Sequence, residues 1–182
     1  MRPFSEDVYN PDQYRIVFSG LKAGAHRFDF HVDQAFFENN GDDLITDVDL
    51  EVAVNLVKEE RMMDIRFSFS GFVIVACDRC NEPVSIKIAG EERLIVKLGE
   101  KYMEESEDVQ IIPETDHHFD ISPFLYEYIH LMLPMKKVHP EDESGNSTCN
   151  PDVLKKLQEL SSDHTPDPRW EVLRKLKKED QS

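Results

Sequence analysis

Basic residues are scarce in this chain of 182 residues, in which 21 lysines and arginines stand against 37 aspartates and glutamates. The formal net charge is -16 at pH 7. An acidic surface of this kind repels phosphate backbones and anionic lipid head groups, which disfavours a wide nucleic-acid interface built from lysine and arginine. We therefore expect a basic protein as the partner.

Cysteines and long apolar runs are also few. The three cysteines are odd in number and widely spaced, so they form a poor disulfide framework and indicate a reducing compartment. No segment approaches the roughly 20 apolar residues of a membrane span, and residues 1–10 contain no apolar signal-sequence core. These absences predict a cytoplasmic protein that does not contact a membrane.

Catalytic motifs are missing as well. The sequence contains no G-x-G-x-x-G, no phosphate-binding loop, no nucleophile elbow and no H-E-x-x-H helix, and its carboxylates are scattered along polar faces. The prediction is a protein that is not an enzyme.

Apolar and polar residues alternate through most of the first two thirds of the chain, as is typical of β-strands. The clearest example places Met63, Ile65, Phe67 and Phe69 on one face, and we expect a bend or bulge at the following Gly71. The predicted strands are residues 14–18, 27–32, 48–56, 63–75, 84–88, 94–98 and 108–112. They predict an antiparallel meander that forms a barrel-like sheet or a small sandwich.

The last third changes to helical spacing. Ser122 followed by Pro123 predicts an N-cap with proline at the first helical position, in a helix that ends before Pro134. Similar pairs at 150–151 and 167–168 predict two further short helices. The fold class is therefore α+β.

An antiparallel β portion, residues 1–112, carries a Cys-x-x-Cys hairpin, and a helical C-terminal portion, residues 113–182, packs on it. We expect the two portions to form one structural domain, because the chain length suits a single core.

Cys77 and Cys80 form a C-x-x-C pair between two predicted strands, and such a pair supplies half of a tetrahedral zinc site from one turn. Cys149 is the remaining thiol, and it lies just before a predicted helix, where free backbone amides favour a thiolate. We choose His139 as the fourth ligand, because it opens the polar loop that Cys149 closes. The prediction is a structural zinc site of Cys77, Cys80, His139 and Cys149.

Other histidines fit less well. His130 falls off the apolar stripe of its predicted helix, and His117 and His118 precede that helix in an acidic segment, so we interpret all three as solvated surface residues. No ligand-like spacing involves the remaining histidines, which are His26, His31 and His164.

Two alternatives to zinc remain open for the thiols. They can be reduced and metal-free, either packed as small apolar groups or exposed, or Cys77 and Cys80 can form a redox-active pair. The redox alternative is weaker, because a thioredoxin-like pair lies at the start of a helix, whereas Cys80 leads into a strand.

Two sets of residues could contact RNA. Phe67, Phe69 and Phe72 lie on a strand without basic neighbours, so we interpret them as core residues rather than a base-stacking platform. A basic cluster near the C-terminus is a local exception to the acidic surface, and we favour a solvated helical face with the tryptophan packed inward over an RNA or protein contact. The cluster comprises Arg169, Arg174, Lys175, Lys177 and Lys178, and Trp170 lies on the same predicted helix.

The order of these features resembles a known family. A Leu-Lys-Ala-Gly turn at 21–24, the C-x-R-C-x-E-P stretch at 77–83 and an L-P-x-K element at 133–136 are similar to those of the YceD family, named for large ribosomal RNA subunit accumulation. Many members carry a second cysteine group after the L-P-x-K element, which implies a zinc site there. This chain departs from that pattern, with His139 and Cys149 in its place.

The resemblance implies a non-enzymatic ribosome-biogenesis factor that supports accumulation of large-subunit ribosomal RNA. Its partners would be components or precursors of the large ribosomal subunit, and the acidic charge favours a basic ribosomal protein among them. Two other functional classes stay open, namely a zinc-dependent enzyme and a redox-regulated interaction module.

Overall fold

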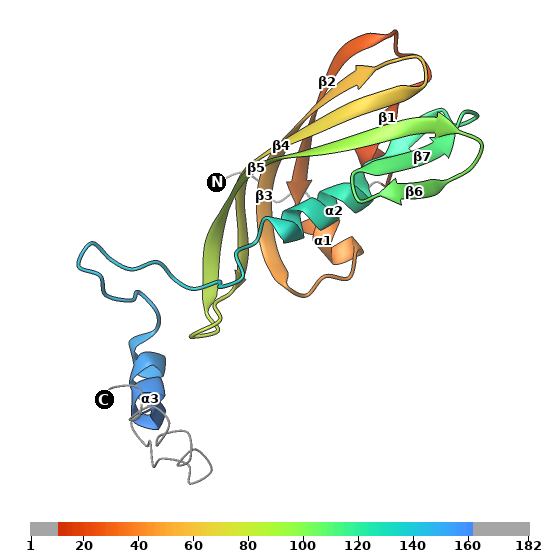
Figure 1. Cartoon of the computed structure of the whole chain (residues 1–182). Coiled ribbons are helices and arrows are strands. Elements are labelled where there is room, and N and C mark those ends of the chain that lie inside the picture. The colour runs from red at the N-terminus through yellow and green to blue at the C-terminus, as the bar shows by residue number, and fades with distance from the viewer. Residues whose placement is uncertain (1–10, 162–182) are drawn as a thin grey trace, which may run out of the picture. The chain divides into compact units, whose positions relative to one another are not determined.

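A six-stranded β-sheet is the main element of the part of the chain that the computed structural model describes, residues 11–161. Its strand order is β2-β3-β4-β5-β7-β6, and among these described strands only β5 and β7 run parallel (Figure 1). The strands are β2 (Gly24–Asp33), β3 (Ile45–Lys58), β4 (Met62–Ala76), β5 (Pro83–Gly99), β6 (Met103–Ser106) and β7 (Val109–Pro113).

Short elements make up the rest of the described secondary structure. A 3-10 helix η1 (Pro11–Tyr14) leads into β1 (Arg15–Val17), which pairs with β8 (His118–Asp120) in a separate two-stranded sheet. The α-helices are α1 (Gln34–Asn39), α2 (Ser122–Leu131) and α3 (Pro151–Ser161). The chain divides into two units with the boundary between His139 and Pro140, so α3 belongs to the second unit.

The alternation of apolar and polar residues gives the long strands one buried face, as the sequence predicts. Met63, Ile65, Phe67 and Phe69 of β4 are each at most 3% exposed. Phe72 lies on the opposite face and is 38% exposed, so its predicted place in the core is wrong.

Helix α2 covers the buried face of the sheet (Figure 1). Its apolar stripe of Leu125, Tyr128 and Ile129 is buried, and the Tyr128 ring lies 5.5 Å from that of Phe67. The helix begins one residue from the expected position, because Ser122 is its first residue rather than its N-cap. Asp120 Oδ1 instead accepts hydrogen bonds from the backbone N–H and the hydroxyl of Ser122.

Gly71 does not produce the expected bulge. The β3–β4 register runs continuously through Gly71, which pairs with Leu50, and the one shift in that pairing lies between Ile45 and Asp47. The glycine is required for another reason: its φ is +152°, and an added Cβ would lie 2.1 Å from the backbone oxygen of Asp49.

The predicted topology needs three further corrections. The sheet is open, not a barrel, since β2 and β6 end the strand order among the described residues. It is not a simple meander either, because β1 pairs with β8 and β7 joins β5 in parallel. The two strands predicted on either side of Gly90 are one continuous strand, β5.

Helix α1 was not predicted, although its start carries a recognisable cap. The Asp33 side chain accepts a hydrogen bond from the backbone N–H of Phe36, and Phe36 and Phe37 are fully buried. Strands β6 and β8 were also missed, because segments of three or four residues are too short to show alternation.

The second unit starts with a tight turn at Asp142. Its Oδ1 accepts hydrogen bonds from the backbone N–H groups of Ser144 and Asn146. Helix α3 then begins at Pro151, as predicted, and Asn150 caps it by accepting a hydrogen bond from Asp152 N at 2.9 Å. Within residues 11–161 no helix has the length and apolar character needed to cross a membrane.

Candidate metal centre

The turn between β4 and β5 positions the two cysteines of the C-x-x-C pair. Cys77 N donates to Glu82 O at 2.9 Å and Asn81 N donates to Cys77 O at 2.8 Å, which closes the turn tightly. Asn81 reaches this geometry with a positive φ of 60°, a conformation that asparagine tolerates better than most residues. The Cys77 and Cys80 side chains are buried, at 2% and 8% exposed.

Backbone contacts bring the segment of His139 to this turn. Asp78 N donates to Lys137 O at 2.7 Å, and Lys137 N in return donates to the Asp78 carboxylate at 2.6 Å. The Lys137 ammonium also lies 3.6 Å from the same carboxylate. This reciprocal pair holds the chain two residues before His139 against the cysteine turn.

Contacts at both nitrogens fix the orientation of the His139 ring. Its Nε2 lies 3.1 Å from Pro83 O, and since a carbonyl oxygen only accepts, Nε2 carries the proton. The neutral tautomer then leaves the lone pair of Nδ1 directed at Cys80 Sγ, which is 3.4 Å away. Metal-bound histidines usually fix their tautomer by such a bond from the other nitrogen.

Cys149 is 4% exposed and directly precedes the Asn150 cap of α3. Its backbone N–H donates to Ser147 Oγ at 3.3 Å. The expected position before a helix start is therefore confirmed.

The ligand atoms of Cys77, Cys80, His139 and Cys149 all lie within 4.8 Å of one another. We call these four residues the Cys/His cluster. Around a tetrahedral zinc ion, sulfur and nitrogen ligands are separated by roughly 3.5–3.8 Å, as follows from the metal–ligand bond lengths. The cluster is thus compatible with a metal site, and its three thiolates and one imidazole are donors that zinc prefers.

The surroundings of Cys77 favour its anionic form. Burial acts to raise the pKa of the Cys77 thiol, but hydrogen bonds from the backbone N–H groups of Cys80, Arg79 and His139 outweigh it and lower the pKa to about 6. The thiolate is the form that binds metals, so Cys77 is prepared for ligation near neutral pH.

The histidines that the sequence analysis set aside at positions 117, 118 and 130 lie outside the cluster. His117 and His118 are exposed, as predicted. His130 is not a solvated residue: its side chain is 25% exposed, and its Nε2 pairs at 2.7 Å with the Asp42 carboxylate, which is 4% exposed. The predicted basic contact surface from Arg169 to Lys178 lies outside the described residues.

Some contacts that position the Cys/His cluster were not predicted from the sequence. The Asp78–Lys137 pair and the Pro83 carbonyl that orients His139 join residues more than 50 positions apart. No pattern along the chain marks such contacts, and the sequence signal nearest to them is the position of Asp78 between the two cysteines.

A comparison with known protein families identifies the chain. The family described as large ribosomal RNA subunit accumulation protein YceD has a model that matches residues 65–177, more than half of the chain. The chain belongs to this family. The matched range starts within β4, extends beyond α3 and includes the whole Cys/His cluster, and the predicted family membership is confirmed. No curated protein and no solved structure matches the chain.

Proposed function

We propose that this protein is a non-enzymatic factor that supports accumulation of large-subunit ribosomal RNA through contacts with proteins of the large ribosomal subunit or its precursors. The family match over residues 65–177 carries the proposal. The formal net charge of -16 supports a basic ribosomal protein as the direct partner, since opposite charge accelerates and stabilises such encounters. This role implies a cytoplasmic protein.

A pull-down with the tagged full chain at moderate salt tests the proposed contacts. We expect enrichment of large-subunit proteins or precursor particles over small-subunit proteins, measured by mass spectrometry. Equal recovery of both subunits would mean that the chain collects basic proteins by charge alone, and recovery of neither would contradict the proposal.

Within this role the Cys/His cluster binds one structural zinc ion. Support comes from the mutual distances of the four ligand atoms, the tautomer of His139 and the lowered pKa of Cys77. Zinc held by four protein ligands has no open position for water or substrate, so this ligand count favours a structural site over a zinc-dependent enzyme.

Metal analysis of purified, reduced protein tests the zinc site. We expect one zinc ion per chain in the wild type and a large loss in Cys77→Ser and His139→Ala. His117→Ala removes an exposed histidine outside the cluster and should retain the ion. Zinc near zero in the metal-replete wild type would overturn the assignment.

A redox-regulated interaction module is the second candidate, because a thiol with a pKa of about 6 is largely thiolate at neutral pH. It predicts a reversible disulfide between Cys77 and Cys80 under mild oxidation. Mass spectrometry after alkylation distinguishes the two candidates, since a zinc-bound pair resists both oxidation and alkylation until the metal is removed.

A direct RNA contact through the helix predicted around Trp170 stays a separate prediction. Reversing the charges of Arg174, Lys175 and Lys178 should then abolish retention of ribosomal RNA, and unchanged retention would exclude that helix.

A further inference from the structure

A cavity of about 260 Å³ lies in the first unit, where β7, the β1–β8 sheet and the start of α2 meet. Its walls combine aromatic rings, carboxylates and one arginine. Among its lining residues are Arg15, Tyr102, Asp116, Phe119, Asp120 and Phe124. Pockets for drug-sized ligands usually measure about 300–1,000 Å³, so this cavity suits a single side chain better than a metabolite.

The two carboxylates keep free acceptor capacity. Asp116 Oδ2 accepts from the Tyr102 hydroxyl, and Asp120 Oδ1 accepts from the N–H of Ser122 at 2.9 Å and from its hydroxyl at 2.7 Å. Within residues 11–161 the other oxygen of each carboxylate accepts no hydrogen bond, although both residues are half-buried. Half-buried acceptors of this kind favour a donor brought by a ligand.

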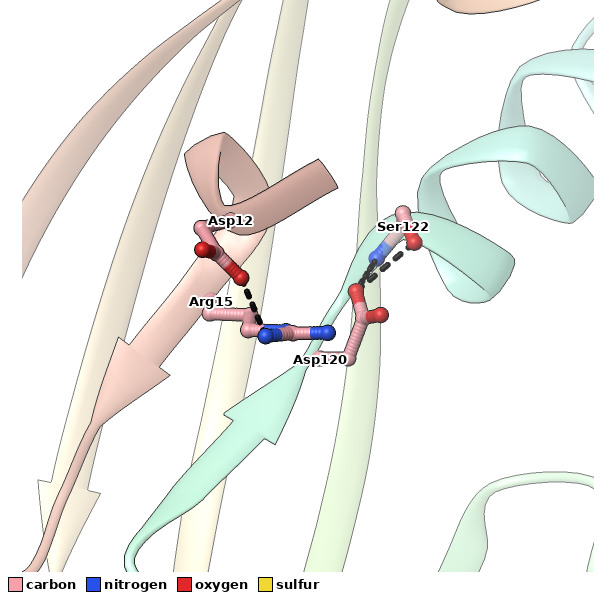
Figure 2. A network of polar contacts seen from close by, with 4 residues as sticks. All are labelled: Asp12, Arg15, Asp120 and Ser122. Carbon is pink, nitrogen blue, oxygen red and sulfur yellow. Dashed lines mark hydrogen bonds and ion pairs between the residues drawn. The ribbon is translucent and has the colours of Figure 1, made fainter. Parts of the chain in front are cut away.

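The arginine in the wall does not use up these acceptors. Figure 2 shows the Arg15 guanidinium between Asp12 and Asp120, and its marked contact is the ion pair with Asp12. The cavity therefore keeps a negative character, since Asp12 already balances Arg15.

Aromatic rings provide the rest of the recognition. The Phe119 and Phe124 rings lie 5.6 Å apart, and Phe119 is 7% exposed, so they form a fixed apolar wall. Tyr102 is 69% exposed, an unusual position for a large aromatic residue, and its bond to Asp116 ties its hydroxyl to a carboxylate of the cavity. Aromatic faces attract cations, and arginine uses them more often than lysine does.

We propose that this cavity binds an arginine side chain from a basic protein partner. A planar guanidinium can stack on an aromatic ring while its N–H groups reach both carboxylates, whereas a lysine ammonium is a compact and strongly hydrated point charge. The occupant rests on the proposed function, which requires a basic partner. The binding chemistry rests on the cavity alone.

Fluorescence anisotropy with the full chain tests the cavity directly. The probe is a labelled glycine-serine peptide that carries spaced arginines, and the comparison probe replaces each arginine by lysine. We expect the arginine peptide to bind about tenfold more tightly at about 0.15 M salt. Equal affinities would contradict recognition of a guanidinium.

Two variants locate the binding. Asp116→Asn and Tyr102→Ala should each weaken the arginine peptide about tenfold, as loss of one charged hydrogen bond or one cation–π contact predicts. Glu51→Gln is the matched control, because it removes the same charge as Asp116→Asn from an exposed position on β3 outside the cavity, and it should change the affinity less than about twofold. Thermal melts verify that all variants are folded.

If Glu51→Gln weakens peptide binding as much as Asp116→Asn does, the effect is one of surface charge and the proposal is overturned. Unchanged binding by Tyr102→Ala would overturn it as well. The outcome is separable from that of the proposed function. Site-specific peptide binding together with a pull-down that recovers no large-subunit protein would retain the cavity and reject the ribosomal partner.

Discussion

Replacing Tyr128 by phenylalanine should stabilise the protein, although most core substitutions destabilise. Tyr128 is 5% exposed and packs against Phe67, Phe69 and Phe124. Within residues 11–161 its hydroxyl has no hydrogen-bond partner. A buried hydroxyl without a partner costs about 1–3 kcal/mol, so Tyr128→Phe should add about 1 kcal/mol to the free energy of unfolding once small packing changes are allowed for.

Tyr14→Phe provides the matched control. Tyr14 is 1% exposed, and its hydroxyl donates to His31 O at 3.0 Å. The same chemical change should here lower the free energy of unfolding by about 1 kcal/mol. For a chain of this size these values correspond to melting temperatures about 2–4 °C higher for Tyr128→Phe and lower for Tyr14→Phe.

The pH dependence supplies a second readout. Burial, and to a smaller extent the charges of Asp108, Glu92 and Glu127, raise the pKa of Tyr128 to about 12. The unfolded chain ionises this group near its ordinary pKa of about 10. The stability that comes from keeping the Tyr128 hydroxyl neutral is therefore fully present below about pH 10, and it is lost as the pH rises towards about 12.

Urea unfolding at neutral pH and from pH 9 to pH 12 measures both effects. Tyr128→Phe should unfold at higher urea than the wild type at neutral pH and should lose less stability on the alkaline side. A destabilisation equal to that of Tyr14→Phe, with an unchanged alkaline slope, would refute the reasoning, because the Tyr128 hydroxyl would then have a partner.

Three further predictions concern the backbone, the contact between His130 and Asp42, and the metal. Gly71→Ala should destabilise the protein by more than about 2 kcal/mol, because the added Cβ would overlap a backbone oxygen of β3. In Gly90→Ala the added Cβ meets only a flexible methionine side chain, so this control should cost less than about 1 kcal/mol. Thermal melts measure both. Asp42→Asn should cost about 2 kcal/mol of folding stability by breaking the half-buried contact with His130. The control Asp43→Asn changes an exposed neighbour and should cost less than about 0.5 kcal/mol. Equal losses of stability in urea unfolding would contradict the contact. Removing zinc with a chelator should lower the melting temperature reversibly, because a ligand at about 1,000 times its Kd adds about 4 kcal/mol to the free energy of unfolding. An unchanged melting curve would contradict a structural metal.

The strands and the cysteine turn were predictable because their determinants are local. Alternating residues such as those from Met63 to Phe69 identify a strand with one buried face, and the C-x-x-C spacing identifies a turn that presents two thiols. His139, chosen from its place at the opening of a loop, lies with the three cysteines in the Cys/His cluster, and its role as a zinc ligand stays a prediction.

Non-local pairing was not predictable in the same way. The parallel addition of β7 to β5, and the pairing of β1 with β8, join segments whose partners are not marked in their own residues. Closure of a sheet depends on accumulated twist and strand register, so the open sheet could not be distinguished from a barrel. His130 was interpreted as solvated because its partner, Asp42, lies 88 positions earlier in the chain.

Quantification of ribosomal RNA in a strain that lacks this protein tests the central claim most directly. The account predicts a selective fall of large-subunit relative to small-subunit ribosomal RNA, restored by the wild-type gene and by the control variant His117→Ala. A ratio of large-subunit to small-subunit ribosomal RNA that deletion leaves unchanged, in slow and in fast growth, would contradict the proposed role.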